Sequence, residues 1–277
     1  MALTALHSVI EKLALAPGIR QIRKRAHNRL FQHNIRRNLF SGIYDSFEAA
    51  ATAAPNHQPH HYNHDAAASL YADMMSRIFD YDYPAMFWLQ QSFAEGLRHV
   101  FDLGGHVGIK YYAFKPKLRP GNNIHWTVGD LPAIVDRGRA LAQQKGVDDQ
   151  LRFADALVEM SGCDVLFASG SLQYLPMTLA ELLADLTQRP RRIIVNITPI
   201  HDEAAYFTVN SIGVAYCPYR IQRRATFIKE VQDCGYVLRD HWRTPGKGME
   251  LPFNSSRSLN AYSGFCFDLA YQPPSPT

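Results

Sequence analysis

The stretch RHVFDLGGHVGIKYY, residues 98–112, decides how this chain is interpreted. An apolar run ends in Asp102, and three glycines follow at positions 104, 105 and 108, with His106 among them. Glycine lets a ligand approach the backbone closely because it carries no Cβ atom. The stretch therefore predicts a strand that ends at a ligand site.

From residue 98 onward, short apolar runs alternate with helical stretches. Strands are predicted at 99–104, 125–130, 151–155, 164–170 and 191–198, and helices at 131–146, 178–190 and 226–235. Two late runs, 236–242 and 261–271, have no helix between them and are predicted to close the sheet in antiparallel fashion. This alternation predicts a doubly wound α/β fold, whose ligands bind at the carboxyl ends of the strands.

Acidic residues end three consecutive predicted strands. Asp130 follows Asp102 by 28 residues, and a carboxylate there can accept hydrogen bonds from both hydroxyls of a ribose. Asp155 ends the third strand, where it could accept a hydrogen bond from the exocyclic amine of adenine. For Asp130 or Asp155 taken singly, the alternative is an acid that caps the following helix. The fourth strand ends in ASGSLQYLP (168–176), which suits the floor of a pocket.

The glycine pattern differs from the G-x-G-x-x-G of dinucleotide sites, because only Gly105-x-x-Gly108 is present, with Gly104 in front. An acid two residues before the first glycine suits a ligand with an ammonium group rather than a phosphate. S-adenosylmethionine (SAM) carries an amino acid end and a sulfonium, and it has no phosphate. The predicted cofactor site comprises Asp102, Gly104, Gly105, His106, Gly108, Asp130, Leu131, Asp155, Ala156, Ser169 and Gly170.

The chain resembles the class I SAM-dependent methyltransferases, and more closely a methyltransferase family often encoded in bacterial surface-polysaccharide clusters. The matching stretches are GIYDSFEAA (42–50), YDYPAMFWL (81–89), VFDLGGHVGIKYY (100–112), WTVGDLPAIV (126–135), LRF (151–153), SGSLQYL (169–175), ITP (197–199) and YCPYRI (216–221). The resemblance implies a Rossmann-like sheet of seven strands, SAM as cofactor and methyl transfer by in-line displacement.

The chain departs from that family at three places. Family members tend to have serine at the position of His106 and glutamate at that of Asp130. An acid followed by arginine is common where this chain has Asn196 and Ile197. The resemblance is therefore firmer for the cofactor than for the acceptor.

The predicted function is SAM-dependent O- or N-methylation of a small-molecule or glycan acceptor. One alternative is a protein of this fold that binds SAM or a nucleoside without transfer, as a scaffold or partner subunit. A nicotinamide-dependent oxidoreductase is a third possibility, and the absent G-x-G-x-x-G motif counts against it.

A hydroxyl acceptor needs a general base near neutral pKa. The segment TPIHDEAAYF (198–207) offers His201 as that base, with Asp202 to orient it. His106 is the rival base, or else a contact for the cofactor. The acceptor pocket could be walled by Tyr174, Tyr206 and Tyr216, unless these rings belong to the core.

Charge separates the two ends of the chain. Residues 1–44 hold eight bases and one acid, a formal charge of +7, which leaves −3 for the rest. The acidic body argues against nucleic acid as a partner. The arm either packs on the body or contacts a partner, a phosphorylated carrier or anionic lipid headgroups as a peripheral membrane contact. We expect a helical arm and cap at 1–95, the SAM-binding domain at 96–272 and a tail at 273–277.

The remaining sequence signals place few further limits. Four scattered cysteines favour a reducing compartment, so a cytoplasmic protein is expected. His57, His60, His61 and His64 have near-helical spacing, but Pro59 interrupts them and no convincing carboxylate set joins them, so no metal site is predicted. The sequence leaves the oligomeric state open, including a homodimer.

Overall fold

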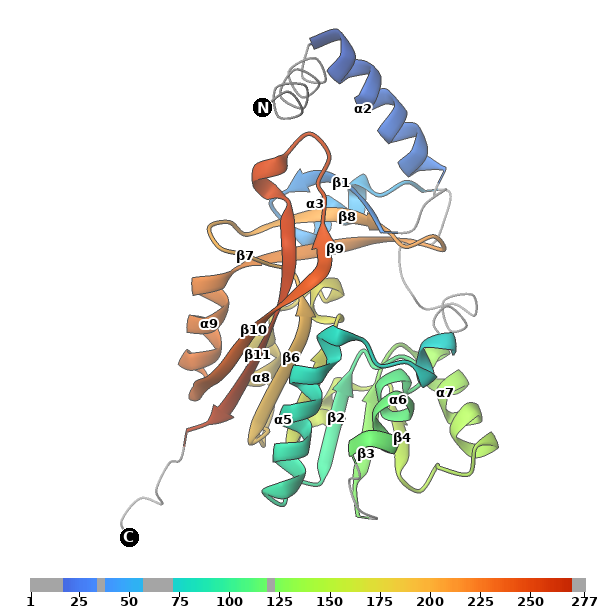
Figure 1. Ribbon diagram of the computed structural model, residues 1–277, viewed down its shortest axis with the longest axis vertical. Helices are drawn as coiled ribbons and strands as arrows, with labels where there is room; N and C mark the ends of the chain where they lie inside the picture. The colour runs from blue at the N-terminus through green and yellow to red at the C-terminus, as the bar shows by residue number, and fades with distance from the viewer. Residues whose placement is uncertain (1–16, 34–37, 57–71, 119–122, 271–277) are drawn as a thin grey trace, which may run out of the picture.

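The computed structural model describes residues 17–33, 38–56, 72–118 and 123–270. Its main sheet has seven strands in the order β10-β11-β6-β5-β2-β3-β4 (Figure 1). These are β2 (His99–Leu103), β3 (His125–Gly129), β4 (Leu151–Ala154), β5 (Val165–Ser169), β6 (Arg192–Thr198), β10 (Tyr236–Met249) and β11 (Leu259–Leu269). The first five are parallel to one another, and β11 runs antiparallel between β6 and β10. The predicted seven-stranded, mostly parallel sheet with an antiparallel finish is confirmed.

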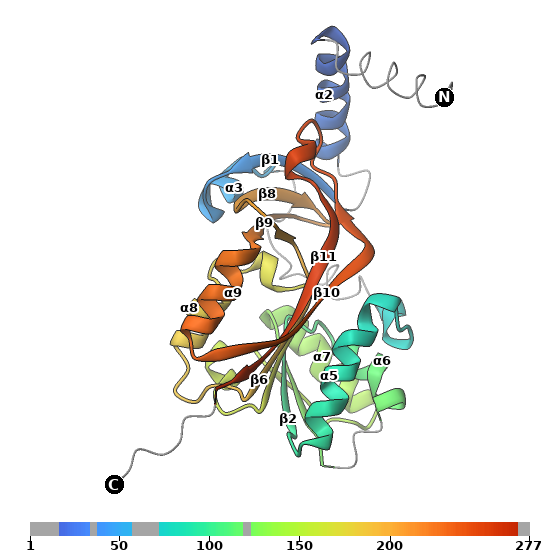
Figure 2. The ribbon, with the colours of Figure 1, turned by 60° about the vertical axis from the view of Figure 1, so that its left-hand side comes forward.

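Helices cover both faces of this sheet, because its central strands are apolar on both sides. One face packs against α5 (Tyr83–Ala94), α6 (Ile109–Leu118) and α7 (Pro132–Gln144) through a core that includes Phe114, Trp126 and Phe167. The other packs against α8 (Leu179–Ala184) and α9 (Arg224–Asp233) around Phe227 and Phe265 (Figure 2). Thr178 and Glu181 form a capping box at the start of α8, which is shorter than the helix predicted at 178–190.

The order of the strands reverses beside β2, which pairs with β3 on one side and with β5 on the other. Loops that leave neighbouring strands in opposite directions open a crevice at such a point. In-register pairing aligns Leu103 with Gly129, and Gly129 with Ala154. The carboxyl ends of β2, β3 and β4 therefore lie side by side.

A second sheet, which the sequence analysis did not predict, lies beyond these carboxyl ends (Figures 1 and 2). Its order is β1-β8-β9-β7, formed by β1 (Leu39–Tyr44), β8 (Tyr206–Ser211), β9 (Tyr216–Arg223) and β7 (Ile200–His201). Of the segment 198–207, Ile200–His201 form β7 shortly after β6, and Tyr206 begins β8. The sheet also contacts α3 (Phe47–Ala53) and the 3-10 helix η4 (Leu172–Tyr174).

The amino-terminal arm is tied to this second sheet. Its helix α2 (Pro17–Gln32) is followed by β1, a strand within the region that was expected to be helical. Strand β1 pairs with β8, for example Phe40 with Asn210. Residues 1–16, the His57–His64 cluster and the 273–277 tail lie outside the described residues.

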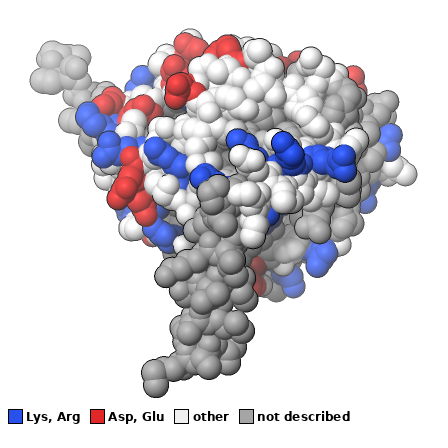
Figure 3. All heavy atoms as spheres, turned by 90° about the horizontal axis from the view of Figure 1, so that it is seen from above, with Lys and Arg blue, Asp and Glu red and all other residues white. Residues whose placement is uncertain are grey.

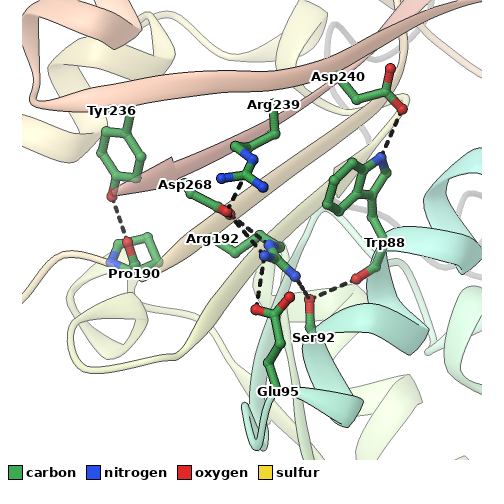
Figure 4. A network of polar contacts seen from close by, with 9 residues as sticks. All are labelled: Trp88, Ser92, Glu95, Pro190, Arg192, Tyr236, Arg239, Asp240 and Asp268. Atoms are coloured by element: carbon green, nitrogen blue, oxygen red, sulfur yellow. Dashed lines mark hydrogen bonds and ion pairs between the residues drawn. The ribbon is translucent and has the colours of Figure 1, made fainter. Parts of the chain in front are cut away.

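A buried arginine fastens α5 to the main sheet at the end opposite to the carboxyl ends (Figure 4). The Arg192 guanidinium, whose side chain is 3% exposed, donates to Asp268 at 2.6 and 3.0 Å and to Glu95 at 3.0 Å. It also donates to Ser92 and lies 5.2 Å from the ring centre of Trp88. The network thus links α5, β6 and β11, with each charge paired.

Candidate functional site

The turn after β2 is shaped by glycine. Gly104 has a φ of +70° and Gly108 a φ of +89°, in the left-handed region that favours glycine. A Cβ on Gly104 would lie 2.4 Å from the Cβ of Ser171, and one on Gly105 would lie 2.4 Å from the Asp102 carboxylate. The backbone here therefore approaches the side chains of Ser171 and Asp102 more closely than any other residue would allow. The predicted close approach of a ligand stays a prediction.

Asp102 lies beneath this turn rather than on its surface. It is 1% exposed, and its Oδ2 accepts a hydrogen bond from Trp126 Nε1 at 3.2 Å. Burial raises the pKa of the Asp102 carboxyl to about 7, against the opposing effects of the Trp126 hydrogen bond and the Lys110 charge. The side chain supports the turn from below. The sequence led us to expect this carboxylate to face the ammonium group of a ligand, but in the structure it lies inside the protein.

Asp130 joins the turn to the end of the next strand. Its Oδ2 accepts from the backbone N–H of His106 at 2.9 Å, and its Oδ1 accepts from that of Leu131 at 2.8 Å. Its own backbone N–H donates to Ala154 O at 3.1 Å, at the end of β4. Each carboxylate oxygen retains a lone pair, so the group can also accept from a ligand.

His106 itself has a φ of +59°, and its side chain is buried. Such a φ is uncommon outside glycine, although histidine is among the residues that tolerate it. The backbone hydrogen bond to Asp130 holds this conformation. The turn therefore fixes the backbone of His106, and its imidazole ring is buried beside the predicted cofactor site.

The other predicted cofactor residues border the same edge. Leu131 is 39% exposed beside Asp130, and Asp155 and Ala156 are exposed after β4. On the other side of β2, Gly170 has a φ of +76° and donates its N–H to Asn196 O at 2.9 Å. The parallel register thus brings together the predicted strand-end residues from β2, β3, β4 and β5.

Sequence reasoning missed Gln173, which follows Gly170 in η4. Its Nε2 donates to Gly170 O at 2.7 Å. Its Oε1 is buried and makes no hydrogen bond with the described residues, and the same holds for Ser169 Oγ. Buried polar atoms usually have partners, so this pair marks a place where a ligand can bind. The sequence pointed to the stretch ASGSLQYLP (168–176) as a pocket floor, but it did not single out Gln173 within it.

The departure at Asn196 and Ile197 has a structural basis. Asn196 is fully buried, donating through Nδ2 to Tyr81 O at 3.0 Å and accepting at Oδ1 from Trp242 Nε1 at 3.0 Å. Both residues oppose Gly264 alone, which makes a bulge at the end of β6. Ile197 has a φ of +52°, a strained conformation for a β-branched residue, and strain of this kind collects at functional sites.

The predicted base His201 holds a turn together. Its Nδ1 accepts from the backbone N–H groups of Glu203 and Ala204, both at 3.0 Å, and its Nε2 lies 2.9 Å from Ser256 O. Both ring nitrogens are therefore engaged. Asp202 does not orient the ring as expected, because its carboxylate accepts from Arg224 at 2.7 Å and from Arg243 at 3.0 Å.

The three predicted tyrosines divide between two roles. Tyr216 is fully buried and donates to Phe31 O and Gln32 O, so it anchors the end of α2. Tyr206 is also buried and donates to Arg257 O. Both fit the alternative that these rings belong to the core. Tyr174 is half-buried in η4, beside Gln173, and donates to Asn210 Oδ1 at 3.0 Å.

Among solved structures, the fold is similar to that of an O-methyltransferase family protein from Burkholderia thailandensis, with a TM-score of 0.52 and 15% identity over 91% of this chain and 71% of that one. The chain has a methyltransferase fold. A Galdieria sulphuraria protein described as a candidate sarcosine dimethylglycine methyltransferase is also similar, with a TM-score of 0.50 and 12% identity over 74% of this chain and 99% of that one.

One other similar structure is longer. The chain spans about half the length of a mitomycin 7-O-methyltransferase, with 54% of that chain and 68% of this one covered, 14% identity and a TM-score of 0.41. No protein-family model and no curated protein matches the sequence.

Proposed function

We propose that this chain transfers a methyl group from SAM to a small-molecule or glycan acceptor, through an oxygen or nitrogen atom. The observation that carries the proposal is the meeting of four strand ends at one edge, with a glycine turn, acids and two buried polar atoms without hydrogen-bond partners among the described residues. The methyltransferase fold supports the same reaction. Membership of the surface-polysaccharide family stays a prediction.

The residues present fit the proposed cofactor. The exposed Gly104 backbone leaves room for a ligand, and the Asp130 carboxylate can accept from ribose hydroxyls while it holds the turn. The exposed Leu131 offers an apolar face beside it for a purine. Ser169 Oγ and Gln173 Oε1 provide polar groups at the β5 side, for the amino acid end or the acceptor.

When bound, the cofactor supplies an electrophilic methyl group. The chain's part is then mainly alignment, because in-line displacement depends on the approach of the acceptor atom. The second sheet lies over the carboxyl edge and can exclude water from it (Figure 2). Strain at Ile197 and the Asn196 bridge fix the end of β6, which borders this space.

Calorimetry with S-adenosylhomocysteine, SAM and NAD tests the cofactor. We expect binding of the first two and not of NAD. Asp130→Asn should weaken S-adenosylhomocysteine binding by roughly tenfold or more, because it removes a charged acceptor. Asp136→Asn, an exposed acid on α7, is the matched control. Wild-type protein that binds neither adenosyl compound would refute the proposal, and binding without transfer to any acceptor would favour the scaffold alternative.

We assign the role of general base to His106, because it borders the proposed cofactor site, whereas His201 uses both ring nitrogens to hold a turn. His106→Asn keeps a residue that tolerates positive φ and removes the titratable ring. We expect kcat to fall by about 10²-fold, with S-adenosylhomocysteine affinity within about threefold of wild type. A large loss of affinity with little change in kcat would instead make His106 a cofactor contact.

A further inference from the structure

Two aromatic rings and three cations form a cluster beside the site. The rings of Phe79 and Tyr81 are stacked, with centres 5.1 Å apart and planes 7° from parallel. Arg77 lies 5.3 Å from the Phe79 ring centre, and Lys247 lies 5.2 Å from that of Tyr81. Lys110 lies 5.9 Å from the first ring and 5.7 Å from the second. We call these five residues the aromatic–cation cluster.

The charges in this cluster are not balanced by the described residues. Lys110 donates to Asp82 at 2.6 Å, and that carboxylate is fully buried. Lys247 is half-buried, and its ammonium makes no hydrogen bond or ion pair with any residue that the structure describes. Burial and the nearby Lys110 lower the pKa of Lys247, and Asp82 opposes this only in part. A half-buried ammonium that makes no hydrogen bond or ion pair with the described residues can bind an anionic ligand.

The cluster adjoins the predicted cofactor site. Lys110 is in the first turn of α6, two residues after Gly108, and its charge acts on Asp102. Tyr81 O accepts from Asn196 at the carboxyl end of β6, in register with Ser169. Lys247 comes from β10, across the sheet from the glycine turn. Two elements, α6 and β10, thus place positive charge on either side of Tyr81.

We propose that Lys247, together with Lys110, binds the carboxylate or phosphate of a ligand that occupies the site; this rests on the proposed function. Two ligands could supply that anion. One is the amino acid end of the cofactor, which Lys110 approaches from the glycine turn. The other is an anionic acceptor, such as a phenolic acid or a phosphorylated sugar.

Lys247→Gln tests the proposal, with Lys145→Gln as the matched control. Lys145 also lies over a tyrosine ring, 5.5 Å from the centre of Tyr112, but at the end of α7 and exposed. Calorimetry would compare S-adenosylhomocysteine, methylthioadenosine and inorganic phosphate. Methylthioadenosine shares the adenosyl group and lacks the carboxylate.

Because the contact is charge-assisted, Lys247→Gln should lose about tenfold in affinity for one of these three ligands. Lys145→Gln should bind all three as the wild type does. A loss confined to S-adenosylhomocysteine assigns the anion to the cofactor. A loss confined to phosphate assigns it to the acceptor. Lys247→Arg keeps the positive charge and should retain most of the affinity. That result would show that the loss in Lys247→Gln comes from the missing charge and not from misfolding.

If Lys247→Gln binds all three ligands with unchanged affinity, the proposal is overturned. The experiment also separates failure of the anion site from failure of the proposed function. Wild-type protein that binds phosphate through Lys247 but no adenosyl compound would retain the anion site and refute the methyltransferase. If the protein binds S-adenosylhomocysteine and no affinity depends on Lys247, the methyltransferase proposal stands and the anion site is refuted.

Discussion

At the scale of single residues, the site combines groups that hold the turn with groups that meet a ligand. Asp102 is the clearest case, because its carboxylate is buried under Gly105 with Trp126 Nε1 as its hydrogen-bond donor. An unpaired charge in such a place destabilises the fold. Burial therefore makes the charged form of this carboxylate costly, and the Trp126 hydrogen bond and the Lys110 charge offset that cost only in part.

Asp102→Asn should show this cost through the pH dependence of stability. The folded-state pKa is raised to about 7, while an unfolded aspartate titrates near ~3.9. The folded protein therefore holds a proton that the unfolded chain releases, and this group lowers stability as pH rises from about 4 to about 7. At pH 8 the variant should be more stable than wild type, by at most about 4 kcal/mol, and near pH 4 the two should be equal.

Urea unfolding at pH 4, 6 and 8 measures this difference. Asp148→Asn, an exposed acid after α7, controls for the loss of a surface charge. A variant that is less stable than wild type at pH 8 would mean that the charged carboxylate is compensated within the protein.

At the scale of elements, the sequence predicted the main sheet but not the second one. Runs such as RRIIVNIT (191–198) are β-branched and bounded, so their strands were evident, and parallel pairing then placed Asp102, Asp130 and Ser169 at one edge. Strand β1 pairs with β8, more than 160 residues later in the chain, and no local pattern specifies such a partner.

The same limit explains the missed contacts around the site. The hydrogen bonds of His201 and Asn196 reach Ser256 and Trp242, which lie in the long β10–β11 hairpin. Residue type and spacing showed only that a histidine follows a strand. Its role depends on a segment that comes 55 residues later.

The Arg192 network should be worth more than the surface ion pairs. Arg192→Met leaves Asp268 and Glu95 without their partner, and breaking a buried pair costs about 3–5 kcal/mol of unfolding free energy. Because Asp268 is 22% exposed, the lower end is expected. Lys229→Met, which breaks an exposed pair with Asp233, should cost under about 0.5 kcal/mol.

Denaturant unfolding measures these costs. The variants compared are Lys229→Met, Arg192→Met, Asp268→Asn and the double variant that combines Arg192→Met with Asp268→Asn. The double variant should lose less than the sum of its two single variants, since each single change leaves a charge unpaired. Additive losses would show that the two side chains act independently.

At the scale of the whole molecule, the two ends differ in chemistry. The predicted site lies between the two sheets, whereas α2 stands out at the far end of the smaller sheet (Figure 1). This helix has five bases and no acid. Seen from that end, Lys and Arg side chains form a band across the surface, and Asp and Glu lie toward its edge (Figure 3). None of the helices in the described part of the chain has the length and apolar composition that a membrane crossing requires.

Membrane contact by α2 is better tested with point variants than with a deletion. Phe31 is buried and Tyr216 donates to the end of α2, so deletion of residues 1–40 would damage the second sheet. Point variants on the outer face avoid this. Ile19 and Ile22 are 42% and 67% exposed there, in a helix with Arg23 and Arg25. Apolar side chains flanked by arginines are typical of helices that lie on anionic lipid surfaces.

We expect the protein to bind vesicles that contain phosphatidylserine, and to bind neutral vesicles much more weakly. Raising the salt from about 0.05 to about 0.5 M should weaken binding, because screening shortens the reach of the arginines. Arg25→Gln should reduce the affinity by roughly fivefold, at about 1 kcal/mol per basic residue near the surface. Ile22→Ser should also reduce it, whereas Arg152→Gln, on the outer strand of the main sheet, should not. Vesicle co-sedimentation measures each case, and binding that ignores salt, or that Arg152→Gln weakens as much as Arg25→Gln, would return α2 to a purely structural role.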